Sequence, residues 1–256
     1  MGASTADFLS PAPPRVFAHR GLATHSPENT LLAFAAAISV GVRYVETDVH
    51  ASADGACVIA HDPDLARVAG RNVRVDSLTL AELKAIDLGQ GQSFCTLDEV
   101  LEAFPETRFN IDVKSAAAVG PVVRSITAAG ASHRVLVSSF SESRRSRALR
   151  GLPLVVSSAS ARRFAVALIA GKLGLQPIVN SVLRGLVAVQ VPERALGLTI
   201  TTPPMIARLH RAGVEVHIWT VNDPERMTQL LDLGVDGIVT DRADLALAVV
   251  AARPKL

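Results

Sequence analysis

Short apolar runs alternate with stretches of helical periodicity along most of the chain. The interiors of these runs show little polar alternation, which is typical of parallel β-strands that are buried on both faces. Helical patterns separate most of them; residues 27–41, for example, begin with a proline and end at a glycine. Eight segments are predicted as strands: residues 15–19, 44–49, 108–113, 134–139, 152–157, 186–191, 215–220 and 236–240.

Repeated strand–helix units predict an α/β fold with one parallel sheet. Eight units in about 240 residues favour a closed (β/α)8 TIM barrel over an open doubly wound sheet, which is the alternative. We assign residues 15–256 to this single barrel domain. Residues 1–14 are rich in proline and small residues, and we predict a flexible N-terminal tail there.

One segment departs from the strand–helix rhythm. An Ala-Asp-Gly turn and the run "CVIAHD" follow the second predicted strand, which indicates a hairpin or a short extra strand. The chain that follows is too long for a simple connection. We therefore predict a small insertion subdomain over about residues 62–95, on one face of the barrel.

Composition narrows the classes of function. The 256-residue chain has a formal net charge of +2, and its densest basic cluster, residues 144–150, would spread around a solvated helix, so we predict no nucleic-acid partner. Its two cysteines form no disulfide framework and no usual zinc motif. The sequence shows no signal-peptide pattern and no apolar segment long enough to span a bilayer, and we predict a cytoplasmic location. The oligomeric state is left open.

Three carboxylates on two predicted strands suggest a cation site. Glu46 and Asp48 lie two apart in one strand and so point to the same side, either the barrel interior or the helix-covered face. Neighbouring buried carboxylates repel each other unless a positive charge compensates. A divalent cation with oxygen ligands would do so, as would salt bridges to Arg20 or Lys114. Asp112 projects from a second strand at a matching height, which favours a metal site.

Two histidines lie where strands end. His19 ends the first strand, and His61 follows the "CVIA" run with Asp62 beside it as a candidate partner that fixes its tautomer. A lone histidine at a strand end is usually polar packing, but two near three carboxylates are typical of a general acid/base pair. Arg20 and Lys114 supply permanent positive charge that could clamp a phosphoryl group.

Three further polar residues allow more than one interpretation. Glu28 and Asn29 open the first helix, where they either cap its start or support His19 or the metal from behind. His217 lies in the middle of a strand, and we interpret it as packing or as indirect support of the site.

Five motifs occur in one order along the chain: "AHRG…PENTLLAF", "VETDVHASADGACVIAHD", "NIDVK", "WTVND" and "GVDGIVTDR". Together they strongly resemble the glycerophosphodiester phosphodiesterase family over about residues 16–248. The H-R-G motif alone is weak, whereas the ordered set is specific.

This resemblance implies a TIM barrel with a small insertion after the H-D motif. It also implies an enzyme that hydrolyses a small-molecule glycerophosphodiester to sn-glycerol 3-phosphate and an alcohol, with one divalent cation, Ca2+ or Mg2+. The family commonly has Glu where this chain has Asp112, a side chain one methylene shorter. The implied site residues are His19 and His61 for catalysis, Glu46, Asp48 and Asp112 for the metal, and Arg20, Lys114 and Trp219 for the substrate.

Other functions stay open at this point. The same site could act on membrane lipids, as a lysophospholipase D or a sphingomyelinase-D-like transferase. The apolar segment 162–189, with its flanking arginines, could then be an interfacial helix, although we favour an outer barrel helix there and no membrane contact. A barrel that binds phosphodiesters without cleaving them is the remaining alternative. The attacking oxygen is either water or the substrate's own glycerol hydroxyl.

Overall fold

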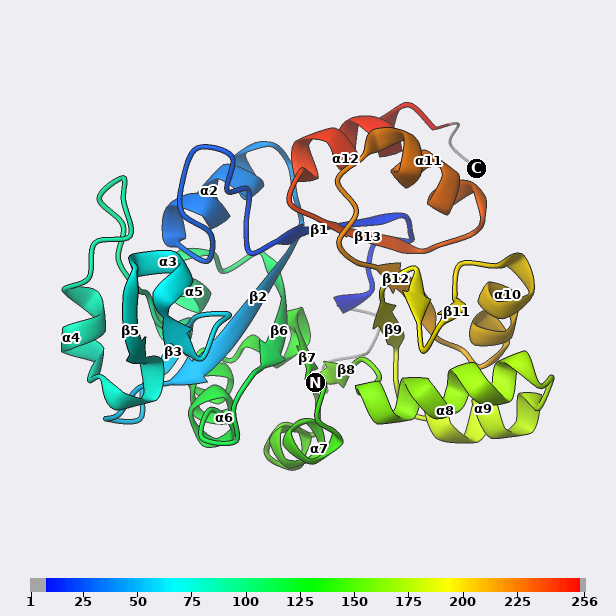
Figure 1. Cartoon of the computed structure of the whole chain (residues 1–256), viewed down its shortest axis with the longest axis horizontal. Helices are drawn as coiled ribbons and strands as arrows, with labels where there is room; N and C mark the ends of the chain where they lie inside the picture. Colours follow the sequence, from blue (N-terminus) through cyan, green and yellow to red (C-terminus); the bar gives the residue numbers. More distant parts are fainter. Residues whose placement is uncertain (1–7, 254–256) are drawn as a thin grey trace.

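Eight parallel strands form a nearly closed barrel in the computed structural model, which describes residues 8–253 (Figure 1). They are β1 (Arg15–His19), β2 (Tyr44–Ala51), β6 (Arg108–Val113), β7 (Val135–Ser138), β8 (Val156–Ser157), β9 (Ala188–Val191), β12 (Glu215–Ile218) and β13 (Gly237–Thr240). Neighbours follow the order β8-β7-β6-β2-β1-β13-β12-β9. A parallel bridge between Ser158 and Ala188 joins the two ends of this order. The predicted (β/α)8 barrel is therefore confirmed.

Helices cover the outside of the barrel (Figure 1). They are α2 (Leu31–Ser39), α5 (Leu97–Ala103), α6 (Val119–Ala128), α7 (Glu142–Gly151), α8 (Ala161–Lys172), α9 (Gln176–Leu183), α10 (Pro203–Arg211), α11 (Pro224–Asp232) and α12 (Ala243–Ala251). The side chain of Thr30 accepts a hydrogen bond from the Ala33 amide, so the first helix begins at Leu31 and not at Pro27 as predicted. Asp223 caps α11 in the same way, and Pro224 is the first residue of that helix.

The segment after β2 forms a small unit of its own beside the barrel. β3 (Cys57–Ile59) pairs antiparallel with the end of β2, as the hairpin signal indicates. Beyond it come β4 (Asp64–Leu65), α3 (Ala66–Ala69), β5 (Arg71–Arg74), the 3-10 turn η1 (Val75–Ser77) and α4 (Leu80–Lys84). They enclose a separate apolar cluster of Val58, Ala60, Leu65, Val75, Leu83, Ile86 and Phe94. A second hairpin, β10 (Arg194–Ala195) with β11 (Leu198–Thr199), lies between β9 and α10.

Aromatic side chains fill the barrel interior near the beginning of β2. Phe17 and Tyr44 lie with their ring centroids 5.0 Å apart, and Phe8 lies 5.4 Å from Tyr44. The Tyr44 hydroxyl donates a hydrogen bond to the Phe8 carbonyl at 2.8 Å. Residues 8–14 fall within the predicted flexible tail, but Phe8 is fully buried because its ring completes this apolar interior. Residues 1–7 of the predicted tail lie outside the described residues.

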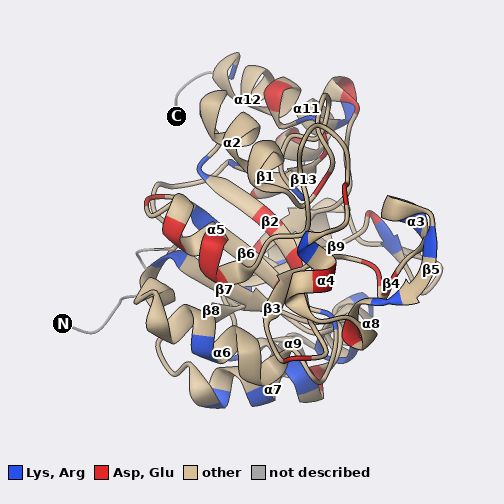
Figure 2. Ribbon diagram, turned by 90° about the vertical axis from the view of Figure 1, so that its left-hand side faces the viewer, with Lys and Arg blue, Asp and Glu red and all other residues tan. Residues whose placement is uncertain are grey.

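The length and the charge of the outer helices bear on two of the predictions. No helix among residues 8–253 is both long and apolar enough to cross a membrane. Figure 2 shows basic and acidic residues interspersed over the ribbon, with several basic residues on α7. Arg145 on α7 is buried and pairs with Glu142 at 2.7 Å, so this arginine of the basic cluster does not lie on the solvated face where we expect it.

Candidate active site

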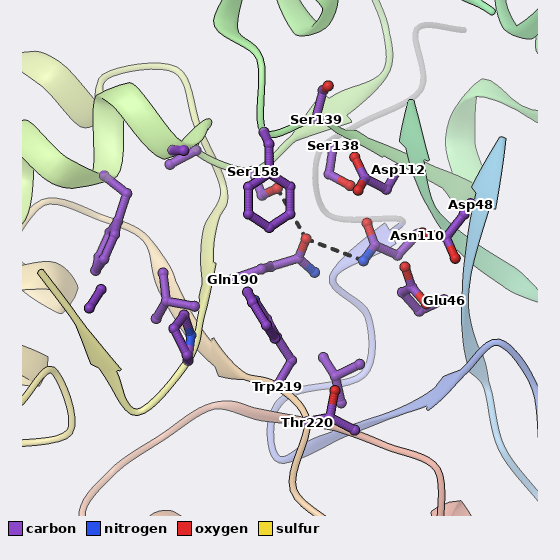
Figure 3. A pocket seen from close by; sticks show the side chains of 18 of the residues that line it. Glu46, Asp48, Asn110, Asp112, Ser138, Ser139, Ser158, Gln190, Trp219 and Thr220 are labelled. Carbon is purple, nitrogen blue, oxygen red and sulfur yellow. Dashed lines mark hydrogen bonds between the residues drawn. The ribbon is translucent and has the colours of Figure 1, made fainter. Parts of the chain in front are cut away.

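A cavity of about 450 Å³ opens at the carboxyl ends of the barrel strands. Figure 3 shows the carboxylates of β2 and β6 grouped together, with Trp219 and Gln190 nearby in the same pocket. Glu46 and Asp48 therefore point into the barrel interior, one of the two faces that the sequence left open. All eight predicted site residues line this cavity: His19, Arg20, Glu46, Asp48, His61, Asp112, Lys114 and Trp219.

Strand register explains why residues distant in sequence meet here. His19 of β1 lies opposite Glu46 of β2, which in turn lies opposite Asn110 of β6. Asp48 lies opposite Asp112 two residues further along the same strands. Because alternate residues of a strand share one face, both levels project into the cavity.

His19 is held by a carboxylate from the opposite end of the sequence. Its Nδ1 atom lies 2.6 Å from Oδ1 of Asp241, whose other oxygen accepts a hydrogen bond of 2.7 Å from Asn222. Burial alone would lower the pKa of His19, but the bond to Asp241 and the charge of Glu46 outweigh it, so the pKa is raised. Asp241 lies in the motif "GVDGIVTDR", but no role for it follows from the sequence.

His61 has a comparable partner next to it in the chain. Its Nδ1 atom lies 2.7 Å from Oδ1 of Asp62, the contact that the sequence suggested. Oδ2 of Asp62 accepts a hydrogen bond of 2.6 Å from Arg67 of α3. In both histidines a carboxylate occupies Nδ1, which fixes ring orientation and leaves Nε2 available for proton transfer.

Arg20 is positioned by an unusual backbone and by two acids. It adopts a positive φ of 58°, and at the following Gly21 a Cβ would lie 2.7 Å from the backbone of Ala33, so only glycine fits there. The guanidinium donates to Glu28 at 2.9 Å and forms an ion pair with Asp48 at 3.3 Å. The sequence allowed two roles for Glu28, helix capping or support of the site. In the structure Glu28 contacts Arg20 of the site, and Thr30 caps the helix instead.

Asp48 is surrounded by positive and hydrogen-bonding partners. Lys114 lies between Asp48 and Asp112, at 2.8 and 2.7 Å, and these two acids raise its pKa despite burial. The amide nitrogen of Asn29 donates to Asp48 at 3.2 Å, so Asn29 also supports the site. The salt-bridge alternative for this acid is therefore observed, with both cations that the sequence named.

Three buried oxygens in the cavity have no hydrogen-bond partner among the described residues. They are Oε2 of Glu46, Oδ1 of Asn110 and Oδ1 of Asp112. Burial and the neighbouring charge of Asp48 raise the pKa of Glu46, and the charges of His19 and Lys114 offset this only in part. Carboxylate and amide oxygens are the ligands that Ca2+ and Mg2+ prefer, and the donor set fits such an ion.

These acids are nevertheless not arranged as a formed metal-coordination site. Within residues 8–253, no group of three or more His, Cys, Asp or Glu side chains is placed so that it could hold a metal ion. The ammonium group of Lys114 instead bridges two of the three predicted ligands, Asp48 and Asp112. The amide oxygen of Asn110, which the sequence analysis did not consider, is a further candidate ligand.

A buried polar chain runs from the cavity toward the barrel floor. Gln190 accepts hydrogen bonds from Asn110 at 3.2 Å and from Ser158 at 3.1 Å (Figure 3). Its amide nitrogen lies 3.4 Å from Nδ1 of His217, whose Nε2 lies 3.0 Å from Glu215. His217 is completely buried, in agreement with its interpretation as packing or indirect support.

The other half of the cavity is apolar. The rings of Phe140 and Trp219 line the cavity with their centroids 6.1 Å apart, and the ammonium group of Lys114 lies 5.9 Å from the centroid of the Phe140 ring. Apolar side chains of α8 and of the β10–β11 hairpin continue this wall: Ala161, Phe164, Ala165, Leu168, Ala195 and Leu196. The cavity thus combines a charged end with an end suited to hydrocarbon.

Comparison with known proteins identifies the family. The model of the glycerophosphoryl diester phosphodiesterase family matches residues 19–245. The chain belongs to this family. It is accordingly a phosphoric diester hydrolase, as the sequence indicated.

Several relatives extend over nearly the whole chain. A probable glycerophosphodiester phosphodiesterase 2 of Mycobacterium tuberculosis is 44% identical over 98% of this chain and 96% of the relative. A lysophospholipase D of Rattus norvegicus is 27% identical over 91% of this chain and 84% of its own. A glycerophosphodiester phosphodiesterase structure from Thermotoga maritima matches with a TM-score of 0.73 and 27% identity, covering 92% of this chain and 97% of that one.

One solved structure carries a ligand. An Oleispira antarctica phosphodiesterase in complex with the product sn-glycerol-3-phosphate matches with a TM-score of 0.77, covering 94% of this chain and 98% of that one. At 23% identity, this likeness concerns the fold.

Proposed function

We propose that this phosphodiesterase hydrolyses glycerophosphodiesters to sn-glycerol 3-phosphate and an alcohol, with His19 and His61 as its general acid/base pair. The observation that supports this is the pair of histidines in one cavity, each with Nδ1 held by a carboxylate at 2.6 and 2.7 Å. The Oleispira antarctica protein with bound sn-glycerol-3-phosphate has the same fold and supports the choice of product.

Charge in the cavity suits a phosphodiester. Arg20 and Lys114 bring two permanent positive charges to its polar end, where they bind and orient the phosphate. One histidine takes the proton from the attacking oxygen as the new P–O bond forms. The other gives its proton to the leaving alkoxide as the old P–O bond breaks. Each such proton transfer contributes a factor of about 100 to 10,000 in rate.

The attacking oxygen belongs either to water or to the neighbouring glycerol hydroxyl. In the second route a cyclic phosphate forms first, and water then opens it. The same two histidines exchange roles between these steps, because the base of one step is protonated for the next.

Glu46, Asp48 and Asp112 would hold one divalent cation, Ca2+ or Mg2+, with the amide oxygen of Asn110 also within the donor set. When bound, such an ion stabilises negative charge on the non-bridging phosphate oxygens. The three unpartnered oxygens and the raised pKa of Glu46 support this proposal. Lys114 would then shift its contacts away from Asp48 and Asp112 toward the phosphate.

A direct assay tests the proposed reaction. Purified protein is incubated with glycerophosphocholine, with and without added Ca2+ or Mg2+, and sn-glycerol 3-phosphate is measured. We expect His19→Ala and His61→Ala to lose activity while circular dichroism stays unchanged. His133→Ala is the matched control, because His133 is exposed and precedes β7 at the opposite end of that strand from the cavity. Near-normal turnover in either site variant would refute the assignment.

A lysophospholipid is the second candidate substrate. The apolar wall along α8 and β10–β11 favours it, since a long acyl chain needs such a surface. The lysophospholipase D of Rattus norvegicus shows that one relative carries that name. Comparing kcat/KM for lysophosphatidylcholine and for glycerophosphocholine decides between the two.

A further inference from the structure

Arg67 belongs to the segment beside the barrel, yet its side chain lines a small pocket together with Glu28, His61 and Asp62. The neighbouring residues fix the backbone of Arg67. Leu65 is completely buried in the local apolar cluster, and Gly70 ends the short helix α3 in a left-handed conformation. About half of the Arg67 side chain is exposed to solvent. The guanidinium group is therefore accessible at one side and bonded at the other.

Arg67 joins two acids that belong to different parts of the site. Its Nε donates to Oδ2 of Asp62 at 2.6 Å, and its Nη2 donates to Oε1 of Glu28 at 2.6 Å. Asp62 holds Nδ1 of His61, and Glu28 accepts a hydrogen bond from Arg20. Arg67 thus contacts neither His61 nor Arg20, but it contacts the partner of each.

The charges explain why an arginine is needed at this point. Asp62 and Glu28 are two carboxylates that share one guanidinium group, and without it they would repel each other. A guanidinium presents several donors in a planar fork, so it can bond both acids at once, whereas an ammonium group is a single point charge. Burial would raise the pKa of Glu28, but the bonds from Arg67 and Arg20 lower it, so this acid stays ionised.

We propose that Arg67 is a positioning residue that fixes His61 and Arg20 relative to each other, and that the segment after β3 is thereby part of the active site. The proposal rests on the proposed function, in which His61 transfers a proton and Arg20 binds the phosphate. Arg67 holds the imidazole ring of His61 through Asp62, and it holds the guanidinium group of Arg20 through Glu28.

Arg67→Ala tests this proposal in the full-length protein. We expect kcat/KM for glycerophosphocholine to fall about 10- to 100-fold, as is usual when a group that orients a reacting residue is lost. Arg67→Lys should recover part of this loss. Arg74→Ala is the matched control, because Arg74 lies on the same segment and pairs with Asp76, away from the cavity. Equal activity of the Arg67→Ala and Arg74→Ala variants would overturn the proposal.

A double variant separates positioning from a general effect on folding. If Arg67 acts through Asp62, the loss in Asp62→Asn/Arg67→Ala is smaller than the product of the two single losses. Losses that multiply would contradict action through Asp62. Free guanidinium at non-denaturing concentration should restore activity to Arg67→Ala, since the site is half exposed.

Calorimetric binding of sn-glycerol 3-phosphate distinguishes failure of this inference from failure of the proposed function. Wild-type protein that binds this compound but hydrolyses no glycerophosphodiester would refute the function, and weaker binding by Arg67→Ala would still support the positioning of Arg20. Wild-type protein that is active, with a variant that binds and turns over equally well, would refute the inference alone.

Discussion

The carboxylate of Asp241, after the last barrel strand, lies 2.6 Å from Nδ1 of His19, at the end of the first. β1 and β13 are adjacent in the barrel, so closure of the sheet brings together two residues that are 222 positions apart. The position of the His19 ring therefore depends on barrel closure as well as on the H-R-G motif.

Asp241→Asn should lower activity and shift its pH dependence. Burial lowers the pKa of His19, but the bond to Asp241 and the charge of Glu46 together outweigh burial, so His19 keeps its proton to higher pH than a free histidine. Loss of the carboxylate lowers that pKa, and the limb of the pH–rate profile that reports His19 moves to lower pH. We expect kcat/KM to fall about 10- to 100-fold. Asp232→Asn, at an exposed ion pair with Arg253, serves as the control, and an unshifted profile would contradict the role of Asp241.

Glu46→Gln and Asp112→Asn should weaken metal activation. Each substitution replaces an oxygen anion of the proposed donor set by a neutral amide, which reduces affinity for a divalent cation. We expect the activation curves for Ca2+ and Mg2+ to move to higher metal concentration, with partial recovery of activity at saturation. Full activity of the wild type in EDTA would show that no metal is needed.

The same Glu46→Gln variant should be more stable than the wild type when metal is removed. Burial and Asp48 raise the pKa of Glu46, so between the ordinary glutamate pKa and the raised pKa the unfolded state releases a proton that the folded state retains, and the wild type loses stability as the pH rises. The difference in free energy of unfolding between Glu46→Gln and the wild type should therefore increase as the pH rises from about 4 toward the raised pKa. We expect the variant to gain about 1–3 kcal/mol in free energy of unfolding near neutral pH.

Urea unfolding in EDTA at several pH values measures this difference. Glu99→Gln is the contrasting control, because bonds from Lys84 and the Thr96 backbone outweigh burial and lower the pKa of Glu99, so its loss should destabilise the protein. A wild type more stable than Glu46→Gln throughout this pH range would contradict the prediction.

Substitutions at the apolar end should separate the two candidate substrates. Phe140 and Leu196 line the cavity and are 57% and 66% exposed, so Phe140→Ser and Leu196→Asp should leave the fold intact. If the substrate carries an acyl chain, both should reduce kcat/KM for lysophosphatidylcholine by about 10-fold and spare glycerophosphocholine. Leu173→Asp is the control, since Leu173 is 68% exposed and lies outside the cavity lining. Equal effects on both substrates would argue against an acyl-chain site.

The fold was predictable because its signals are local. β1 and β6 have the predicted bounds, Arg15–His19 and Arg108–Val113, since a buried parallel strand is read directly from a short apolar run. β8 is shorter than predicted and holds only Val156 and Ser157, because the apolar residues before it belong to the connection from α7. Phe8 was missed because proline-rich sequence indicates the absence of helix or strand but not the absence of packing.

The site was predictable to the extent that residues occur in motifs. All eight predicted residues line one cavity, yet the partners Asp241 and Arg67 were missed. Their roles come from contacts between distant segments, and a single sequence carries no signal for such contacts. Lys114 was predicted either as a phosphate ligand or as a salt-bridge partner of the strand carboxylates, and its contacts with Asp48 and Asp112 agree with the second interpretation.

The aromatic rings of Phe8, Phe17 and Tyr44 form a floor beneath the acidic end of the cavity. A ligand cannot pass through the barrel, because that space is filled by side chains and not by solvent. A ligand therefore enters and leaves at the carboxyl ends of the strands, where the cavity opens. Because the cavity is closed at the opposite end, each phosphate product must leave before the next diester can bind.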